Sequence, residues 1–144
     1  MLKKLPSEKK VYIDEETGRE VWQMTGGEAV SHSCYQEVEA FTDDERFVVF
    51  SSNRSGTFQL FRAELDGGEL AQLSDVKDYG SISFGMARNG CEAFYTAGWQ
   101  IYGVDVATGE DRVVVDLKGK IPNSPNKSAA IALSANGDRC LVSL

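Results

Sequence analysis

The sequence predicts an all-β protein that repeats a unit of four short antiparallel strands. Three observations support this: two blocks of residues recur along the chain, polar turns separate their β-rich runs, and the blocks return at a regular interval. A period of roughly 45 residues with four strands per unit is typical of a β-propeller blade. We therefore expect a β-propeller of four-stranded antiparallel blades, present here as an incomplete N-terminal portion.

Each block supplies two strands of the unit. The first is an apolar residue, a polar turn and a β-rich run, in copies at 41–50, 86–95 and 133–142. Turns of the Asn-Gly type between extended runs are a strong hairpin signal. The second is a pair of runs around a turn with glycine, in copies at 11–25, 60–74 and 101–115. The runs are short and rich in β-branched and aromatic residues, which disfavours helices.

The two blocks place the strands in order. The first full blade is predicted at 35–41, 46–52, 58–65 and 69–74. The second is predicted at 81–87, 91–97, 100–106 and 111–117, and a third begins with 128–135 and 139–144. After a charged segment at 1–10, residues 11–14 and 20–25 match the last two strands of a unit. Because no first pair precedes them, we expect them to complete the last blade of a closed ring.

The predicted blades are too few to close a ring, because β-propellers have about 4–8 of them. Each blade buries its faces against its neighbours, so an incomplete array leaves apolar edges exposed. We expect either that the chain is part of a longer protein or that copies associate to complete the ring.

Composition excludes several classes of function. The 144 residues include 15 basic and 22 acidic side chains, a net charge of −7, which argues against general nucleic-acid binding. No apolar run approaches the ~20 residues that cross a bilayer, and the first ten residues lack the apolar core of a secretory signal. The three cysteines show no metal-binding or disulfide spacing. We therefore expect a cytoplasmic protein that binds neither nucleic acid nor membranes.

Strand parity divides the loops between two faces of the propeller. The turns inside the two strand pairs of each blade share one face, which is strongly acidic. The loops 25–33, 53–58, 74–79, 97–100 and 117–127 share the other face, which is slightly basic. Propeller ligands typically occupy the channel mouth, where the sign of the field matters. We expect the basic face to be functional, and its candidate residues are His32, Arg54, Lys77, Tyr79, Trp99 and Lys127.

Each candidate has a functional and a structural interpretation. The planar fork of Arg54 suits a carboxylate, although surface arginines also pair locally. Trp99 or Tyr79 offers an apolar platform to a sugar ring, but packing between blades is an equal alternative for Trp99. His32 and Tyr35 would be neutral hydrogen-bonding partners of a ligand, although a lone histidine is often a loop or packing residue.

The residues predict neither a catalytic nor a metal site within the chain. The acidic turns at 14–16 and 43–45 lack the alternating ligand spacing that calcium needs, so we expect solvated turns. There is no nucleophile elbow, and the chain has one histidine.

Several motifs, taken in order, resemble one family. They are Tyr12-Ile13-Asp14, Thr17-Gly18-Arg19-Glu20-Val21, Gln23-Met24-Thr25, Ser31-His32 with Tyr35, Arg46 to Arg54, Leu60-Phe61, Gly68-Glu69 and Gln72-Leu73-Ser74. This pattern is similar to the N-terminal part of the oligogalacturonate lyases, seven-bladed propellers that cleave short pectin fragments by β-elimination. One departure is Ser31-His32-Ser33, where the family tends to carry a histidine pair followed by an aromatic stretch.

The resemblance implies a polysaccharide lyase that acts on an anionic oligosaccharide. It also implies a divalent metal, usually manganese, and a catalytic histidine, both held by later blades. This chain would then supply scaffold and substrate rim, and would be inactive alone. The alternative is a non-catalytic propeller that binds proteins or saccharides, as repeats of envelope-transport components do.

Overall fold

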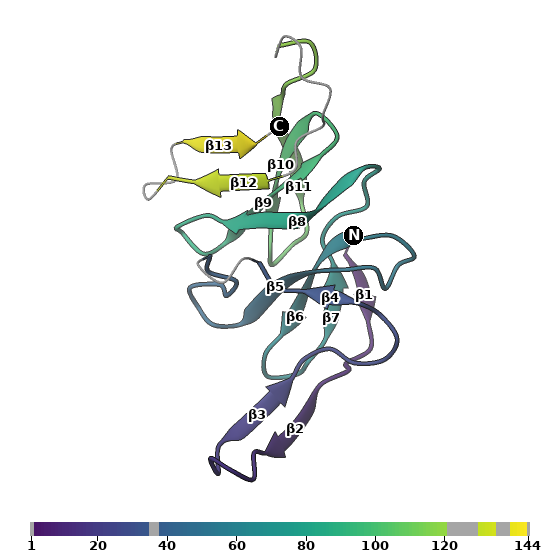
Figure 1. The fold of residues 1–144 in the computed structure, drawn as a ribbon, viewed down its shortest axis with the longest axis vertical. Coiled ribbons are helices and arrows are strands. Elements are labelled where there is room, and N and C mark those ends of the chain that lie inside the picture. Colours follow the sequence, from purple (N-terminus) through teal and green to yellow (C-terminus); the bar gives the residue numbers. More distant parts are fainter. Residues whose placement is uncertain (1, 35–37, 121–129, 135–138, 144) are drawn as a thin grey trace.

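A computed structural model of the chain describes residues 2–34, 38–120, 130–134 and 139–143. These residues form strands, turns and irregular segments, and no part of them is a helix that could span a membrane. Four antiparallel sheets follow one another along the long axis of the molecule (Figure 1). The described chain is therefore all-β and open, as expected for part of a propeller.

The two larger sheets correspond to the two predicted full blades. In the first, the order is β1 (Lys3–Leu5), β7 (Leu70–Gln72), β6 (Gln59–Glu64), β5 (Phe47–Ser52) and β4 (Ser31–His32). In the second, it is β11 (Asp111–Asp116), β10 (Gln100–Asp105), β9 (Glu92–Ala97) and β8 (Tyr79–Met86). Two smaller sheets pair β2 (Lys10–Ile13) with β3 (Glu20–Gln23), and β12 (Ala130–Leu133) with β13 (Cys140–Ser143).

The innermost strand of the first blade differs from the prediction. Residues 38–40 form no strand, Phe41 makes a single bridge with Val48, and residues 35–37 lie outside the described part. The innermost strand is instead β4, whose approach is fixed by side chains at the end of β5. The Asn53 Oδ1 atom accepts the Val30 N–H at 2.8 Å, and the Ser52 hydroxyl donates to the Val30 carbonyl at 3.0 Å. These side-chain contacts hold β4 beside the end of β5, whereas at 40–41 only the Phe41 bridge and the bond from the Val49 N–H to the Ala40 carbonyl, at 2.8 Å, join the chain to β5.

The N-terminal segment is also more ordered than its charge indicates. Lys3–Leu5 pairs with β7 and adds a fifth strand to the outer edge of the first blade. The Lys4 ammonium forms an exposed ion pair with Glu69 at 3.1 Å, and Leu5 packs against the cluster around Phe61. The outer edge of this blade is therefore covered, whereas that of the second blade, β11, is exposed.

The hairpin β2–β3 stands apart from the first blade. Within the described residues its strands pair only with each other. Apolar side chains on it remain exposed, by 52% for Val11, 59% for Ile13 and 42% for Trp22. The assignment of this pair to the last blade of a closed ring stays a prediction.

The second repeated block folds into the same turn at its two Thr-Gly copies. The Asp14 carboxylate accepts the N–H and the hydroxyl of Thr17, and the Gly18 N–H donates to the Asp14 carbonyl at 2.8 Å. Asp105 makes the equivalent bonds to Thr108, and the Gly109 N–H donates to the Asp105 carbonyl at 2.8 Å. Here Asp14 and Asp105 act as turn-forming residues.

Two turn carboxylates, those of Asp14 and Asp44, predict that the protein loses stability in acid. The Thr17 hydroxyl and N–H hold the pKa of Asp14 below its usual value, and the Thr42 hydroxyl and the Arg46 N–H do the same to the pKa of Asp44. A carboxylate whose folded-state pKa is lowered stabilises the protein above its unfolded pKa, and this contribution is lost as pH falls through the lowered pKa. We expect the free energy of unfolding to decline below about pH 4, as measured by urea denaturation. A D14N/D44N variant should show a shallower decline; an unchanged pH profile would contradict this explanation.

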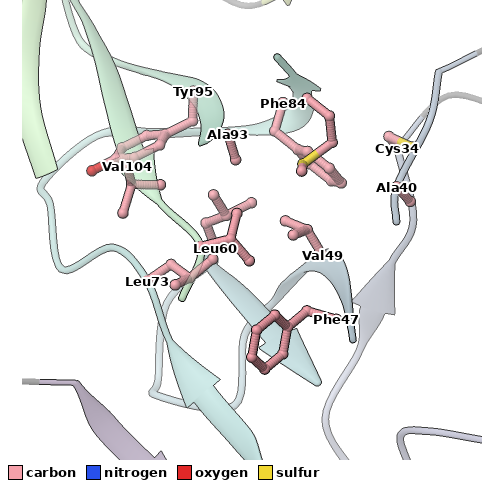
Figure 2. Close-up of a cluster of buried hydrophobic side chains, with 12 residues drawn as sticks. Cys34, Ala40, Phe47, Val49, Leu60, Leu73, Phe84, Ala93, Tyr95 and Val104 are labelled. Atoms are coloured by element: carbon pink, nitrogen blue, oxygen red, sulfur yellow. The ribbon is translucent and has the colours of Figure 1, made fainter. Parts of the chain in front are cut away.

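The main core lies between the two larger sheets (Figure 2). Side chains of the first blade, including Val49 and Leu60, face Phe84, Tyr95 and Val104 of the second. All five are at most 2% exposed. A smaller cluster around Phe50 and Phe61 lies on the opposite face of the first blade, where Leu5 and Met24 pack against it. The first blade is therefore buried on both faces.

Gly90, in the turn before β9, packs closely against Asp43, in the turn before β5 of the neighbouring blade. Its φ is +61°, and an added Cβ would collide with the side chain and the backbone nitrogen of Asp43. We expect Gly90→Ala to lower the free energy of unfolding by about 2–4 kcal/mol, from left-handed strain and overpacking together. Gly18 has a similar φ of +68° with nothing near its Cβ position, so Gly18→Ala should cost only about 1–2 kcal/mol. Equal losses in urea denaturation would refute the packing contribution.

Candidate functional site

The ends of the two blades that carry the candidate residues lie together. The hydroxyls of Ser51 in β5 and Tyr79 in β8 are 2.7 Å apart. Ser31 pairs with Ser52 at the end of β5, and Tyr79 pairs with Ala97 at the end of β9. The loops after β5 and β9 and the start of β4 therefore share one end of the molecule, as strand parity predicts.

Tyr79 is a packing residue of this end and not a sugar platform. Its ring is tilted against that of Tyr95, with centroids 5.6 Å apart, and its hydroxyl is bonded to Ser51. Burial raises the pKa of Tyr79, an effect that the Ser51 hydrogen bond only partly offsets. The side chain thus joins the two blades.

His32 lies at the edge of the first blade opposite β1. It lies in β4, the innermost strand of the first blade, and is exposed. Its imidazole stacks on the ring of Phe58 with centroids 5.4 Å apart and an interplanar angle of 25°. One ring face is therefore covered, and the polar ring is held at the surface on the innermost strand.

Arg54 is buried and already holds a carboxylate. Its side chain is 5% exposed, and its Nη1 atom is 2.9 Å from the Glu8 Oε1 atom. The Nε atom donates to the Ser52 hydroxyl at 3.1 Å and the Nη2 atom to the Ser31 hydroxyl at 3.2 Å. The guanidinium also lies 5.3 Å from the ring centroid of Phe50. A substrate carboxylate could reach Arg54 only by displacing Glu8.

The remaining candidates are partly described. Trp99 is half-buried at the tip of the β9–β10 hairpin, where its carbonyl accepts the Leu117 N–H at 2.9 Å. Lys77 is exposed in the loop before β8. Tyr35 and Lys127 lie outside the described residues. The structure thus brings His32 and Trp99 to the same end of the molecule and buries Arg54 against Ser31, the residue before His32.

Sequence reasoning missed two charged residues. No sequence pattern around Glu8 indicates its role, because its partner Arg54 lies 46 residues away. Arg62 stands in the middle of an apolar run and is 6% exposed, with its guanidinium 3.8 Å from the ring centroid of Phe47. Burial lowers the pKa of Arg62, and its Nε atom has no hydrogen-bond partner among the described residues.

The described residues do not fit a manganese site. Among them no three His, Cys, Asp or Glu side chains are close enough together to hold a metal ion. His32, the one histidine in the sequence, contacts Phe58.

Two surface pockets of the first blade have acidic residues in their linings, unlike the end that carries His32. One of about 480 Å³ is lined by Glu39, Asp43 and Glu45 together with Phe41, Thr42 and Leu65. Another of about 500 Å³ lies between β3 and the first blade and is lined by Glu20, Trp22, Met24, Phe41, Val48 and Leu65. Carboxylates on these rims would repel an anionic saccharide.

Solved structures are similar to this chain, whereas no protein-family model and no curated protein sequence matches it. An oligogalacturonate lyase from Vibrio parahaemolyticus superposes with a TM-score of 0.78 and 17% identity over 94% of this chain. An oligogalacturonate lyase in complex with manganese gives 0.76 and 21%, also over 94%. TolB from Acinetobacter baumannii gives 0.52 and 16% over 88%.

The chain spans only part of each of these proteins. It covers 35% of the length of each lyase and 29% of TolB. Identities of this size show the fold, and the open antiparallel sheets agree with it. The chain has the fold of part of a β-propeller, similar to that of the oligogalacturonate lyases.

Proposed function

We propose that this chain is the N-terminal part of an oligogalacturonate lyase-like protein of the cytoplasm, which cleaves short oligogalacturonides by β-elimination. The observation that carries the proposal is the similarity to two such lyases over 94% of the chain. The chain would supply scaffold and part of the substrate rim. The manganese would come from other blades, because no three His, Cys, Asp or Glu side chains of the described residues are close enough to hold it, and we assign the catalytic base to those blades as well.

The chemistry assigns the chain a binding role. β-Elimination removes the proton α to a carboxylate, and the developing negative charge must be stabilised. An oligogalacturonide is a polyanion whose sugar rings also have apolar faces. The protein surface that binds it therefore needs neutral or cationic hydrogen-bond donors and an aromatic side chain. His32 and Trp99, with Tyr35, are the residues that we assign to this contact. Arg54, 5% exposed, would support the rim from below unless substrate displaces Glu8.

The hairpin β2–β3 fits this proposal as the outer half of a closing blade. Its exposed Val11, Ile13 and Trp22 would be covered by the two inner strands of that blade or by a further blade. Association of several copies is the other way to cover them. In both cases a closed ring would place His32 at the channel.

The test is lyase activity of the full-length protein on trigalacturonate, followed by the ultraviolet absorbance of the unsaturated uronate. We expect His32→Ala to lower kcat/KM by roughly tenfold, the loss expected for one hydrogen bond to a charged group. Arg19→Ala, which removes an exposed charge from a turn at the acidic end, should leave kcat/KM unchanged. Equal effects of the two variants would refute the role of His32, and no product from the wild type would refute the lyase proposal.

A second function is favoured by the similarity to TolB. A TM-score of 0.52 over 88% of the chain is compatible with a propeller that binds a protein or a saccharide without catalysis. Binding of trigalacturonate at the His32 end without any unsaturated product would support this alternative.

A further inference from the structure

One carboxylate joins three parts of the fold that are distant in sequence. The Glu8 Oε1 atom accepts from Arg54 at 2.9 Å, and its Oε2 atom accepts the Gly26 N–H at 2.7 Å. Gly26 follows the β2–β3 hairpin, and Arg54 lies in the loop after β5. Glu8 itself lies between β1 and β2, so it connects the hairpin to the first blade.

From Arg54 the connection continues to the innermost strand. The Nη2 atom of Arg54 donates to the Ser31 hydroxyl at 3.2 Å, and the Ser31 hydroxyl donates to that of Ser52 at 3.1 Å. Ser31 is the residue before His32. The strand that both residues form is only two residues long, so its backbone pairing contributes little to holding it. Its position therefore depends on side-chain bonds, namely those of Ser52 and Asn53 to the Val30 backbone and that of Arg54 to Ser31.

The geometry of Arg54 makes this connection rigid. Its guanidinium lies 5.3 Å from the Phe50 ring centroid and 5.5 Å from that of Phe61. Each of its three nitrogen atoms donates a hydrogen bond: Nε to Ser52, Nη1 to Glu8 and Nη2 to Ser31. A planar group with fixed donors on several sides transmits the position of Glu8 to Ser31.

We propose that Glu8 is a positioning residue for His32, acting through Arg54 and Ser31. This rests on the proposed function only in assigning His32 to the substrate rim; the positioning itself does not require catalysis. The consequence is that docking of the N-terminal segment and the hairpin sets the geometry of the candidate site. Glu8 forms an ion pair with Arg54, the residue that the sequence alone suggested as the partner of a substrate carboxylate.

Because the sequence has one histidine, its ring signals report on this proposal without ambiguity. In proton–carbon NMR spectra of the protein, the His32 ring should show nuclear Overhauser contacts to the Phe58 ring, with which it stacks at 5.4 Å. We expect Glu8→Ala to abolish these contacts and to move the His32 ring signals toward those of an unstructured peptide. Glu8→Gln, which keeps one carbonyl acceptor, should retain part of them.

Two further variants separate positioning from general loss of structure. Glu69→Ala removes a different carboxylate that pairs with the N-terminal segment, through Lys4, and should leave the His32–Phe58 contacts intact. Ser31→Ala removes the two bonds of the Ser31 hydroxyl, to Arg54 and to Ser52, while leaving Glu8 in place, and should weaken the contacts even if Glu8→Ala unfolds the protein. Intact His32–Phe58 contacts in folded Glu8→Ala, or in Ser31→Ala, would overturn the proposal. Loss of lyase activity alone would bear on the proposed function and not on this positioning.

Discussion

Replacing Phe61 by alanine is expected to lower the free energy of unfolding by about 3–5 kcal/mol, the usual cost of emptying a buried aromatic site. Phe61 is fully buried and stacks with Phe50 at a centroid distance of 6.0 Å. The Arg54 guanidinium, 5.5 Å from its ring centroid, would also lose a neighbour. Urea denaturation measures the change as a lower midpoint with an unchanged slope.

Phe41 is the matched control for this prediction. It lies in the same blade but is 44% exposed, so Phe41→Ala should cost about 1 kcal/mol or less. Similar losses for the two phenylalanines would contradict the assignment of the second core cluster to the face of the first blade that the hairpin approaches.

Removing Glu8 while Arg54 remains is expected to cost about 2–4 kcal/mol, because an unpaired cation would stay buried. The value lies toward the lower part of the range for buried pairs, since the Glu8 side chain is 34% exposed. Arg54→Met on its own leaves a more exposed carboxylate and should cost less. The double variant, Glu8→Ala with Arg54→Met, should therefore be more stable than Glu8→Ala alone.

Denaturation of the four proteins gives the coupling free energy of the pair. Additive effects, with no recovery in the double variant, would mean that Glu8 and Arg54 do not interact in solution.

The second blade shows what the sequence could predict. Its four strands lie within two residues of the predicted bounds, and the Asp105–Thr108 turn has the form that the Thr-Gly repeat indicated. These features depend on local chemistry: an Asn-Gly or Thr-Gly turn and a short apolar run determine a hairpin without help from distant residues.

The errors fall where distant residues decide the outcome. Lys3–Leu5 has two lysines and one leucine, so no local pattern marks it as a strand; it is one because the edge of β7 is available. The sequence did not predict the strand at 31–32, which pairs with β5 where Ser52 and Asn53 bind the backbone at Val30. Pairing across a sheet is not encoded in a window of ten residues.

The candidate site shows the same division. Loop parity predicted correctly that the loops after β5 and β9 share one end, because hairpin connectivity alone requires it. It could not predict that Arg54 points into the blade, since that depends on Glu8, Phe50 and Phe61. Nor could it predict that the Tyr79 hydroxyl forms a hydrogen bond with that of Ser51. Which polar side chains remain available is decided by packing.

Titration of the isotopically labelled protein with trigalacturonate tests the central claim most directly. We expect the signals of His32 and of the Trp99 indole to shift together with increasing ligand, whereas those of Thr17 and Thr108, in the turns with acidic residues, stay constant. The neutral trisaccharide of galactose should produce much smaller shifts at equal concentration. Unchanged His32 and Trp99 signals, or equal shifts with the neutral sugar, would contradict the assignment of this end of the blades to an anionic oligosaccharide.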